Sequence, residues 1–257
     1  MTTTLPHQLD RTITIRAPRD TVFRFFTDNA RWASWWGAGS TIDPRPDGRI
    51  FIRYPDGTEA VGEVVELRAP ERIAFSYGFV SGKLIPPGGS RVTIRLERDG
   101  DGTRLHLAHE FADAAVREEF VQGWRYQLSL FANIVADEIH EEATALADAW
   151  FAAWGESDGT AREREIRRIA SPAVTFQDRF SCTAGLEDLL PHLTAAQRFM
   201  PGMRLRREGD LRHCQGVALA DWVAVGADGQ ERARGTNVFV FGVDGRIESV
   251  TGFWRRS

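Results

Sequence analysis

The amino-acid sequence predicts an α+β protein made of two domains, and three observations support this prediction. The chain has 257 residues, a length that suits two domains of about 100 to 150 residues better than a single domain. Runs of alternating apolar and polar residues, which are typical of strands, occur on both sides of a proline-free segment, residues 113–154. Within this segment apolar side chains recur every three or four residues, as they do along one stripe of a helix.

The segment 113–154 is too long to lie within one small domain. As a single helix it would span roughly 60 Å at 1.5 Å per residue. We therefore expect it to close the first domain, residues 1–140, and to open the second domain, residues 141–257. A polar patch within residues 137–142 is where we expect a bend or a break, although no Gly or Pro requires one.

The first domain is predicted to contain antiparallel strands, two short helices and the first part of the long helix. Residues 11–16 alternate like a strand, and short helices are expected after Pro18 and from Asn29. Turn pairs such as Asp47-Gly48 and Asp56-Gly57 then separate segments rich in β-branched and aromatic residues. These segments are residues 49–54, 59–67, 72–79, 91–98 and 103–111. The pattern predicts a meander with one face covered by the helix that begins near Asp113.

Motifs of the first domain occur in an order that resembles the SRPBCC superfamily of helix-grip domains. They are AP-x-x-x-VF at residues 17–23, the WW pair at 35–36, the segments 45–67 and 70–75, and the GW pair at 123–124. Within this superfamily the sequence is most similar to the bacterial homologues of the heat-shock ATPase activator. The resemblance covers nearly all of residues 9–140 and implies a curved sheet that grips the long C-terminal helix.

The same resemblance implies an apolar ligand held between the sheet and the long helix. The aromatic, apolar and histidine residues expected to line such a pocket are Trp35, Trp36, Phe51, Phe75, Tyr77, Phe79, His106, Trp124, Leu128 and Phe131. An alternative stays open, because aromatic side chains at strand and helix spacing also form the cores of small domains. His106, which alternates with two leucines, is the polar member of the set, and a solvent-facing position on its strand is the competing interpretation.

The second domain is predicted to consist of helices followed by a sheet. A helix is expected from near Thr160 to the Ser171-Pro172 pair, then a strand over residues 173–180, then a helix over 186–199 that Pro191 kinks or restarts. Four strands are expected over residues 204–214, 216–226, 232–242 and 247–254. This is a cone-like α+β pattern with a bent antiparallel sheet.

The second domain is similar to SnoaL-like proteins of the nuclear transport factor 2-like superfamily. The residues that carry this resemblance are 173–178, Gly185 and 235–254. The resemblance to isomerases of this superfamily implies Asp178 as a general base, with Trp150 and Asn237 as hydrogen-bond donors. The pocket around them would be lined by Phe176, Trp222, Phe239 and Trp254. The alternative is that Asp178 caps a turn and that Asn237 bonds to backbone groups in the sheet.

Composition and motifs exclude several classes of function. The net charge of -4 gives no broad basic field, which argues against a nucleic-acid partner. No window of 18 apolar residues and no signal peptide are present, so we expect a cytoplasmic protein without membrane insertion. No P-loop, dinucleotide, zinc-protease or serine-hydrolase motif occurs, and we expect neither a metal nor a cofactor. Cys182 and Cys214 are expected to be reduced, packed thiols.

Three hypotheses for function follow. The first is the binding of a small hydrophobic molecule, aromatic or polycyclic, in one or both domains. The second is a cofactor-independent isomerase, cyclase or hydratase that uses Asp178 on a polyketide-like or steroid-like substrate. The third is an interaction protein that contacts a chaperone, or a homodimer formed through the sheet of the second domain. Burial of Asp178 beside Trp150 and Asn237, next to an empty cavity, would favour the second hypothesis over the first.

Overall fold

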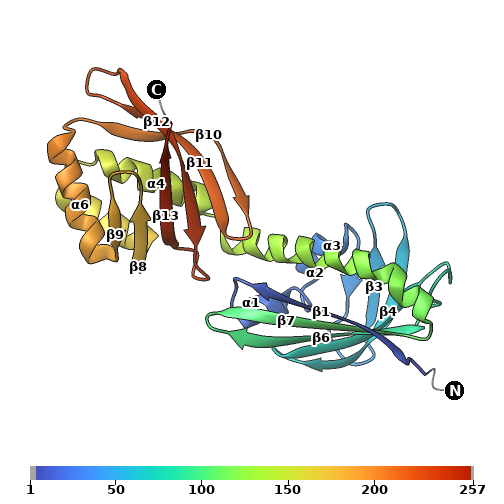
Figure 1. Ribbon diagram of the computed structural model, residues 1–257. Helices are drawn as coiled ribbons and strands as arrows, with labels where there is room; N and C mark the ends of the chain where they lie inside the picture. Colours follow the sequence, from blue (N-terminus) through green and yellow to red (C-terminus); the bar gives the residue numbers. More distant parts are fainter. Residues whose placement is uncertain (1–3, 256–257) are drawn as a thin grey trace. The chain divides into compact units, whose positions relative to one another are not determined.

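The structure is a computed structural model that describes residues 4–255, and it divides into two compact units, residues 1–135 and 136–257. The sequence placed the domain boundary at 140/141, five residues later. Both units combine helices with one sheet, which confirms the predicted α+β class (Figure 1).

The N-terminal unit contains a seven-stranded antiparallel sheet in the order β1-β7-β6-β5-β4-β3-β2. Its strands are β1 (His7–Ile15), β2 (Thr41–Ile42), β3 (Arg49–Arg53), β4 (Glu59–Arg68), β5 (Arg72–Phe79), β6 (Ser90–Asp99) and β7 (Gly102–Phe111). The helices are α1 (Arg19–Arg24), α2 (Asn29–Trp36) and α3 (Ala114–Ile139). The two-residue strand β2 is the one strand that the sequence pattern did not predict, because it is too short to show alternation.

Local chemistry explains where the N-terminal helices begin and end. The side chain of Asp28 accepts a hydrogen bond from the backbone N–H of Arg31 at 2.9 Å, which caps α2. Gly37 ends α2 with φ 134°, and a Cβ at this position would lie 2.2 Å from the carbonyl oxygen of Arg53. Asp113 caps α3 through the backbone N–H of Ala115 at 2.6 Å. The tight approach at Gly37 brings the end of α2 against the end of β3.

Helix α3 holds the two short helices and the sheet together through aromatic contacts. The ring of Phe131 lies 5.7 Å from Phe25, 5.2 Å from Phe26 and 4.9 Å from Trp35, measured between centroids. About two and three turns towards the N-terminus, the rings of Trp124 and Phe120 contact His109 of β7. The apolar stripe predicted for this helix therefore faces the core of its own unit.

The predicted break in the long helical segment is observed. Helix α3 ends at Ile139, and α4 (Ala143–Gly155) begins after a three-residue interruption. His140 is buried there, and its Nε2 atom lies 3.0 Å from the carbonyl oxygen of Gly242. The expectation of a break at the polar patch is confirmed.

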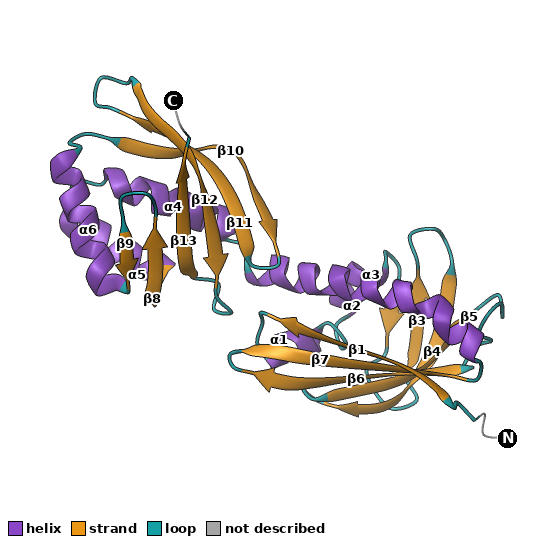
Figure 2. Cartoon of the chain, in the orientation of Figure 1, coloured by secondary structure: helices purple, strands orange, loops and turns teal. Residues whose placement is uncertain are grey.

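The C-terminal unit contains a six-stranded mixed sheet in the order β10-β11-β12-β13-β8-β9 (Figure 2). Its strands are β8 (Ala170–Gln177), β9 (Cys182–Ala184), β10 (Arg204–Cys214), β11 (Val217–Val225), β12 (Glu231–Phe241) and β13 (Ile247–Trp254). Besides α4 the helices are α5 (Gly159–Ile169) and α6 (Leu186–Phe199), and α4 packs against β10 while α6 packs against β8 and β9. Strand β8 pairs with β13 in parallel. The sheet is therefore mixed, whereas a purely antiparallel sheet was expected.

Two further details of the C-terminal unit differ from the sequence-based expectation. Strand β9 was not predicted, since three residues give too short a pattern. Helix α6 continues through Pro191 as one helix rather than restarting there. The side chain of Pro191 is exposed, and at such a position water can bond to the carbonyl group that proline leaves without a helical donor.

Candidate functional site

A cavity of about 560 Å³ opens in the N-terminal unit beside the first half of α3. Its walls come from four places: the end of α2, the β3–β4 connection, the end of β5 with the loop after it, and α3. Eight aromatic side chains line it, namely Trp35, Trp36, Tyr54, Tyr77, Phe79, Phe120, Trp124 and Tyr126. The remaining lining residues are Ser34, Gly37, Pro55, Asp56, Thr58, Leu84, Glu119, Gly123, Gln127 and Leu130.

The aromatic walls are arranged around Trp36. Its ring centroid lies 4.2 Å from that of Trp35, with an angle of 34° between the planes. Tyr54 stands nearly perpendicular to Trp36 at 5.9 Å and 89°, and Trp124 does so at 5.8 Å and 73°. Edge-to-face contacts of this kind are favourable and fix the ring planes. The result is a set of rigid walls that meet at right angles.

A buried hydrogen-bond chain supports this wall from behind. The indole N–H of Trp124 donates to Nδ1 of His109 at 2.9 Å. Because Nδ1 is the acceptor, the proton of the neutral ring is on Nε2, which donates to the hydroxyl of Ser90 at 2.9 Å. The hydroxyl of Ser90 in turn donates to the carbonyl oxygen of Tyr77 at 3.0 Å. Burial lowers the pKa of His109 to about 3, so the ring is neutral at physiological pH.

Two tyrosine hydroxyls meet inside the cavity. The hydroxyls of Tyr54 and Tyr77 lie 2.8 Å apart and form a hydrogen bond. Burial raises the pKa of Tyr54 to about 12 and also raises the pKa of Tyr77. Both phenols therefore stay neutral and offer donor and acceptor capacity without a charge.

The mouth of the cavity is formed by exposed apolar and acidic residues. Tyr126 and Leu84 are 69% and 60% exposed, and the charged lining residues are Asp56 and Glu119. Gly123 lies in α3 on the same wall, and a Cβ placed there would meet no atom within 4 Å. The glycine therefore leaves open space beside the cavity.

Five of the ten residues expected to line the pocket of the first domain are brought together at this cavity: Trp35, Trp36, Tyr77, Phe79 and Trp124. Phe75 is fully buried and lies 5.9 Å from Trp32, so it belongs to the core beneath the cavity rather than to its surface. His106 lies elsewhere. Its ring contacts Thr12 and Glu97 at 3.1 Å on the solvent face of the sheet, which corrects its expected place in the pocket.

Sequence reasoning missed Gly123 and Tyr54 in the wall of the cavity and His109 behind that wall, and two of the three left a detectable signal. His109 shares the alternation of the buried residues Leu105, Leu107 and Phe111 on β7, which places it on the inner face. Gly123 is the only glycine within α3, and an isolated glycine in a helical pattern often has a packing or functional reason. Tyr54 lies in a connection, where no periodicity could predict its direction.

In the C-terminal unit the predicted aromatic residues divide between two environments. Trp150, Phe176 and Phe239 belong to the packed core, where the centroid of Trp150 lies 5.6 Å from Phe176 and 6.3 Å from Phe239. The indole N–H of Trp150 is buried and has no hydrogen-bond partner among the described residues. Among residues 4–255 no hydrogen bond joins Trp150 to Asp178, and Trp150 packs in the buried apolar core of the unit.

Asp178, which follows β8, and Asn237 of β12 lie together on either side of Gly252 of β13. A Cβ at Gly252 would lie 3.1 Å from the Cβ of Asp178 and 3.2 Å from Oδ1 of Asn237. The indole of Trp254 donates to Oδ2 of Asp178 at 3.0 Å, and the indole of Trp222 donates to Oδ1 of Asn237 at 2.9 Å. Oδ1 of Asp178 also accepts from the backbone N–H of Phe180 at 2.8 Å. The carboxylate is half-buried and borders a surface depression of about 490 Å³.

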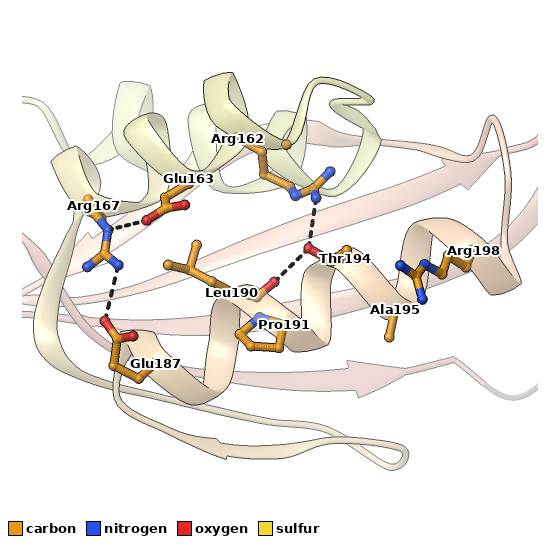
Figure 3. A pocket seen from close by; sticks show the side chains of 10 residues that line it. Arg162, Glu163, Arg167, Glu187, Leu190, Pro191, Thr194, Ala195 and Arg198 are labelled. Atoms are coloured by element: carbon orange, nitrogen blue, oxygen red, sulfur yellow. Dashed lines mark hydrogen bonds and ion pairs between the residues drawn. The ribbon is translucent and has the colours of Figure 1, made fainter.

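A third hollow, of about 480 Å³, lies between α5 and α6 and is lined by charged groups that bond to each other (Figure 3). Arg167 bridges Glu163 at 2.8 Å and Glu187 at 3.1 Å. Arg162 is buried and donates to the hydroxyl of Thr194 at 2.9 Å and to the carbonyl oxygen of Glu156 at 2.6 Å. These contacts join the two helices.

Three properties of residues 4–255 bear on other classes of site. None of their helices is long and apolar enough to cross a membrane. Over the same residues no group of three or more His, Cys, Asp and Glu side chains is placed to hold a metal ion. Cys182 and Cys214 are free and exposed, so the expectation that both are packed inside was wrong.

The N-terminal unit thus has the architecture of a helix-grip domain: a curved antiparallel sheet, two small helices and one long helix with a cavity beside it. Residues 16–136 match the family model of activator of Hsp90 ATPase homolog 1-like proteins. The resemblance expected for this unit is therefore confirmed. The C-terminal unit has the order of elements that the sequence predicted for it.

Solved structures are similar to about half of this chain. A SnoaL-like family protein from Agrobacterium tumefaciens is 24% identical, over 46% of this chain and 99% of its own, with a TM-score of 0.43. CalU16 from Micromonospora echinospora is 25% identical over 56% of this chain and 85% of its own, with a TM-score of 0.43. An Aha1 dimer from Colwellia psychrerythraea is 14% identical over 48% and 90%, with a TM-score of 0.42. No curated protein matches this chain by sequence.

Proposed function

We propose that this protein binds a small hydrophobic molecule with an aromatic or polycyclic body in the cavity of its N-terminal unit. The observation that carries the proposal is the cavity of about 560 Å³ with eight aromatic side chains in its walls. This volume lies within the range of small-molecule sites, roughly 300 to 1,000 Å³. The rigid ring walls need little ordering on binding, which lowers the entropic cost of association.

Several polar groups of the cavity already have partners, whereas the indole N–H of Trp36 is buried without a hydrogen-bond partner among the described residues. Tyr54 and Tyr77 bond to each other, and the N–H of Trp124 is already used by His109. A ligand therefore gains mainly from burial of its rings, at about 25 cal/mol per Å² of apolar surface removed from water.

The lone glycine in the wall provides a sharp test. Gly123→Leu places a side chain in the open space without a clash and favours the helix, while Gly123→Ala favours the helix and leaves most of the space open. The probe is N-phenyl-1-naphthylamine, a neutral aromatic dye whose fluorescence rises in apolar surroundings. We expect wild type and Gly123→Ala to bind it with similar affinity and Gly123→Leu to bind at least tenfold more weakly. Equal binding by all three proteins, or binding by none of them across a wider panel of flavonoids and steroids, would contradict the proposal.

Acid–base chemistry at Asp178 is a second candidate, favoured by its place beside Asn237 at a surface depression. A general base on a carbon acid requires a carboxylate near a substrate pocket and donors for the developing enolate. In this arrangement Trp254 donates to the carboxylate itself, and the amide of Asn237 keeps its NH₂ group available for a substrate oxygen. Asp178→Asn is expected to abolish the turnover of any isomerase, cyclase or hydratase substrate found, with little change in melting temperature. Full turnover by this variant would remove the candidate.

A homodimer formed through the C-terminal sheet is a further proposal, because two phenylalanines lie exposed beside Asp178. Phe253 on β13 is 57% exposed and Phe180 is 69% exposed. Large apolar side chains are enriched at interfaces and depleted elsewhere on the surface. Light scattering at micromolar concentration checks this, and a monomer mass for the wild type would reject it.

A further inference from the structure

The charge of the cavity rim points to the kind of aromatic molecule that the cavity takes. Two lining residues are ionisable acids, Asp56 and Glu119, and no lysine, arginine or histidine is among the residues that line it. Asp56 accepts a hydrogen bond from the backbone N–H of Thr58 at 2.9 Å, which lowers the pKa of its carboxyl group and keeps it ionised. The mouth therefore attracts cations and repels carboxylates.

The walls behind this rim are suited to the same charge. The faces of indole and phenol rings carry partial negative charge, and an ammonium group within about 6 Å of several such faces is attracted by all of them. Trp36 has Tyr54 and Trp124 nearly perpendicular to it, so three rings present differently oriented surfaces around one corner of the cavity. The hydroxyls of Tyr54 and Tyr77 stay neutral, and their oxygen lone pairs accept hydrogen bonds from an N–H or stand near a methylated nitrogen.

We infer that the cavity of the N-terminal unit selects an organic cation, an aromatic or alicyclic molecule that carries a tertiary or quaternary ammonium group, over its neutral and anionic counterparts. This inference rests on the proposed function and specifies the ligand of the same cavity. The ring walls supply the shape and the cation–π attraction, and the two carboxylates supply long-range attraction at the mouth. An aromatic acid of equal size is excluded by the same two charges.

Three probes of nearly the same shape and different charge separate these effects. Phenyltrimethylammonium is the cation, tert-butylbenzene is its neutral carbon isostere, and 2-methyl-2-phenylpropanoate is the anion. Quenching of tryptophan fluorescence and titration calorimetry with the full chain give the affinities. We expect the cation to bind at least tenfold more tightly than tert-butylbenzene, and the carboxylate to show no binding at the same concentrations.

Variants assign the effect to the cavity and its rim. The double variant Asp56→Asn, Glu119→Gln is expected to weaken binding of the cation about threefold or more and to leave tert-butylbenzene unaffected. Glu118→Gln removes one charge from the adjacent position of α3, which does not line the cavity, and should change neither affinity. Gly123→Leu should abolish binding of the cation, and added salt should weaken binding of the cation by the proteins that keep Asp56 and Glu119.

The outcomes distinguish a failure of the inferred cation selectivity from a failure of the proposed function. If tert-butylbenzene binds as tightly as the cation and Gly123→Leu abolishes both, the cavity binds hydrophobic molecules but does not select cations, and the inference is overturned while the proposed function stands. Tighter binding of the carboxylate than of the cation would likewise overturn the inference and leave the proposed function standing. If none of the three probes binds, and the neutral dye does not bind either, both the inference and the proposed function fail.

Discussion

The two units use the same plan, one sheet packed against helices, but they use their large aromatic side chains in opposite ways. In the N-terminal unit Trp36, Tyr54 and Trp124 stand around open space. In the C-terminal unit Trp150, Phe151 and Phe239 fill the interior, each with 1% exposure or less. The contrast shows that an α+β fold of this kind does not by itself provide a pocket. Side-chain size at a few inward positions decides whether the space is filled.

The largest expected effect is a loss of stability when the packed interior is hollowed. Trp150→Ala removes a fully buried indole and should lower the free energy of unfolding by about 3 to 5 kcal/mol. Phe120→Ala, in the wall of the open cavity, should cost less, about 1 to 2 kcal/mol, because its site is already in contact with solvent. Urea denaturation measures both. Equal losses would show that the two units are packed alike and would remove the contrast.

Trp150→Phe separates packing from a polar role of the same side chain. It keeps a ring and removes the N–H that has no partner among the described residues, so we expect a cost below about 1.5 kcal/mol. A much larger loss would indicate that the N–H has a function that packing does not explain.

The second effect is a pH dependence that belongs to the N-terminal unit. Burial lowers the pKa of His109 to about 3, whereas an unfolded histidine titrates near 6.5. Below pH 6.5 the unfolded chain binds a proton that the folded chain does not. The stability contributed by the neutral ring is therefore complete above this pH and is lost at about 1.4 kcal/mol per pH unit as the pH falls towards 3.

A pair of variants isolates this contribution. His109→Gln can still accept from Trp124 and donate to Ser90 but does not titrate, so the difference in unfolding free energy between wild type and variant should shrink or reverse as the pH falls from 7 to 4. His106→Gln removes the imidazole on the exposed face of the same strand, so comparison of the two variants shows which part of the pH trend belongs to the buried ring. A pH-independent difference for His109→Gln would contradict the account.

The smallest effect compares one glycine in each unit. Gly123→Ala enters open space within a helix and should raise the free energy of unfolding by about 0.5 to 1 kcal/mol. Gly252→Ala brings a methyl group to 3.1 Å from the Cβ of Asp178 and 3.2 Å from Asn237, so the neighbours must shift and we expect a loss of up to about 1 kcal/mol. Thermal unfolding of the two variants should show that Gly123→Ala raises stability and that Gly252→Ala lowers it. A gain for Gly252→Ala would show that Asp178 and Asn237 move apart freely.

The sequence was sufficient to predict the elements that repeat a pattern over many residues. The apolar stripe of the long helical segment and the polar interruption near His140 were both predicted and observed. Strands β2 and β9, with two and three residues, are too short for any alternation to appear. Pro191 was expected to kink α6 or to restart it, and the helix continues past this residue without a restart.

The residues of the candidate sites were predictable in part, from family resemblance and aromatic content rather than from a repeated pattern. Trp35, Trp36, Tyr77 and Trp124 could be chosen because family resemblance and aromatic content pointed to them, and they line the cavity. His106 was chosen in place of His109, although the neighbours of His109 on β7 showed which face is buried. The contacts of Asp178 with Trp254 join residues 76 positions apart in the sequence, and no pattern along one element can show such a contact.

At position 123, the stability of helix α3 and the volume of the cavity place opposite demands on the residue. Almost any replacement would make α3 a better helix, and engineers who stabilise proteins routinely exchange helical glycines for this reason. Here each added carbon at position 123 would extend into the space beside the cavity. A lineage or a library selected only for thermal stability should therefore lose this glycine first. In a related protein, the size of the residue at this position would indicate the largest molecule that the cavity can bind.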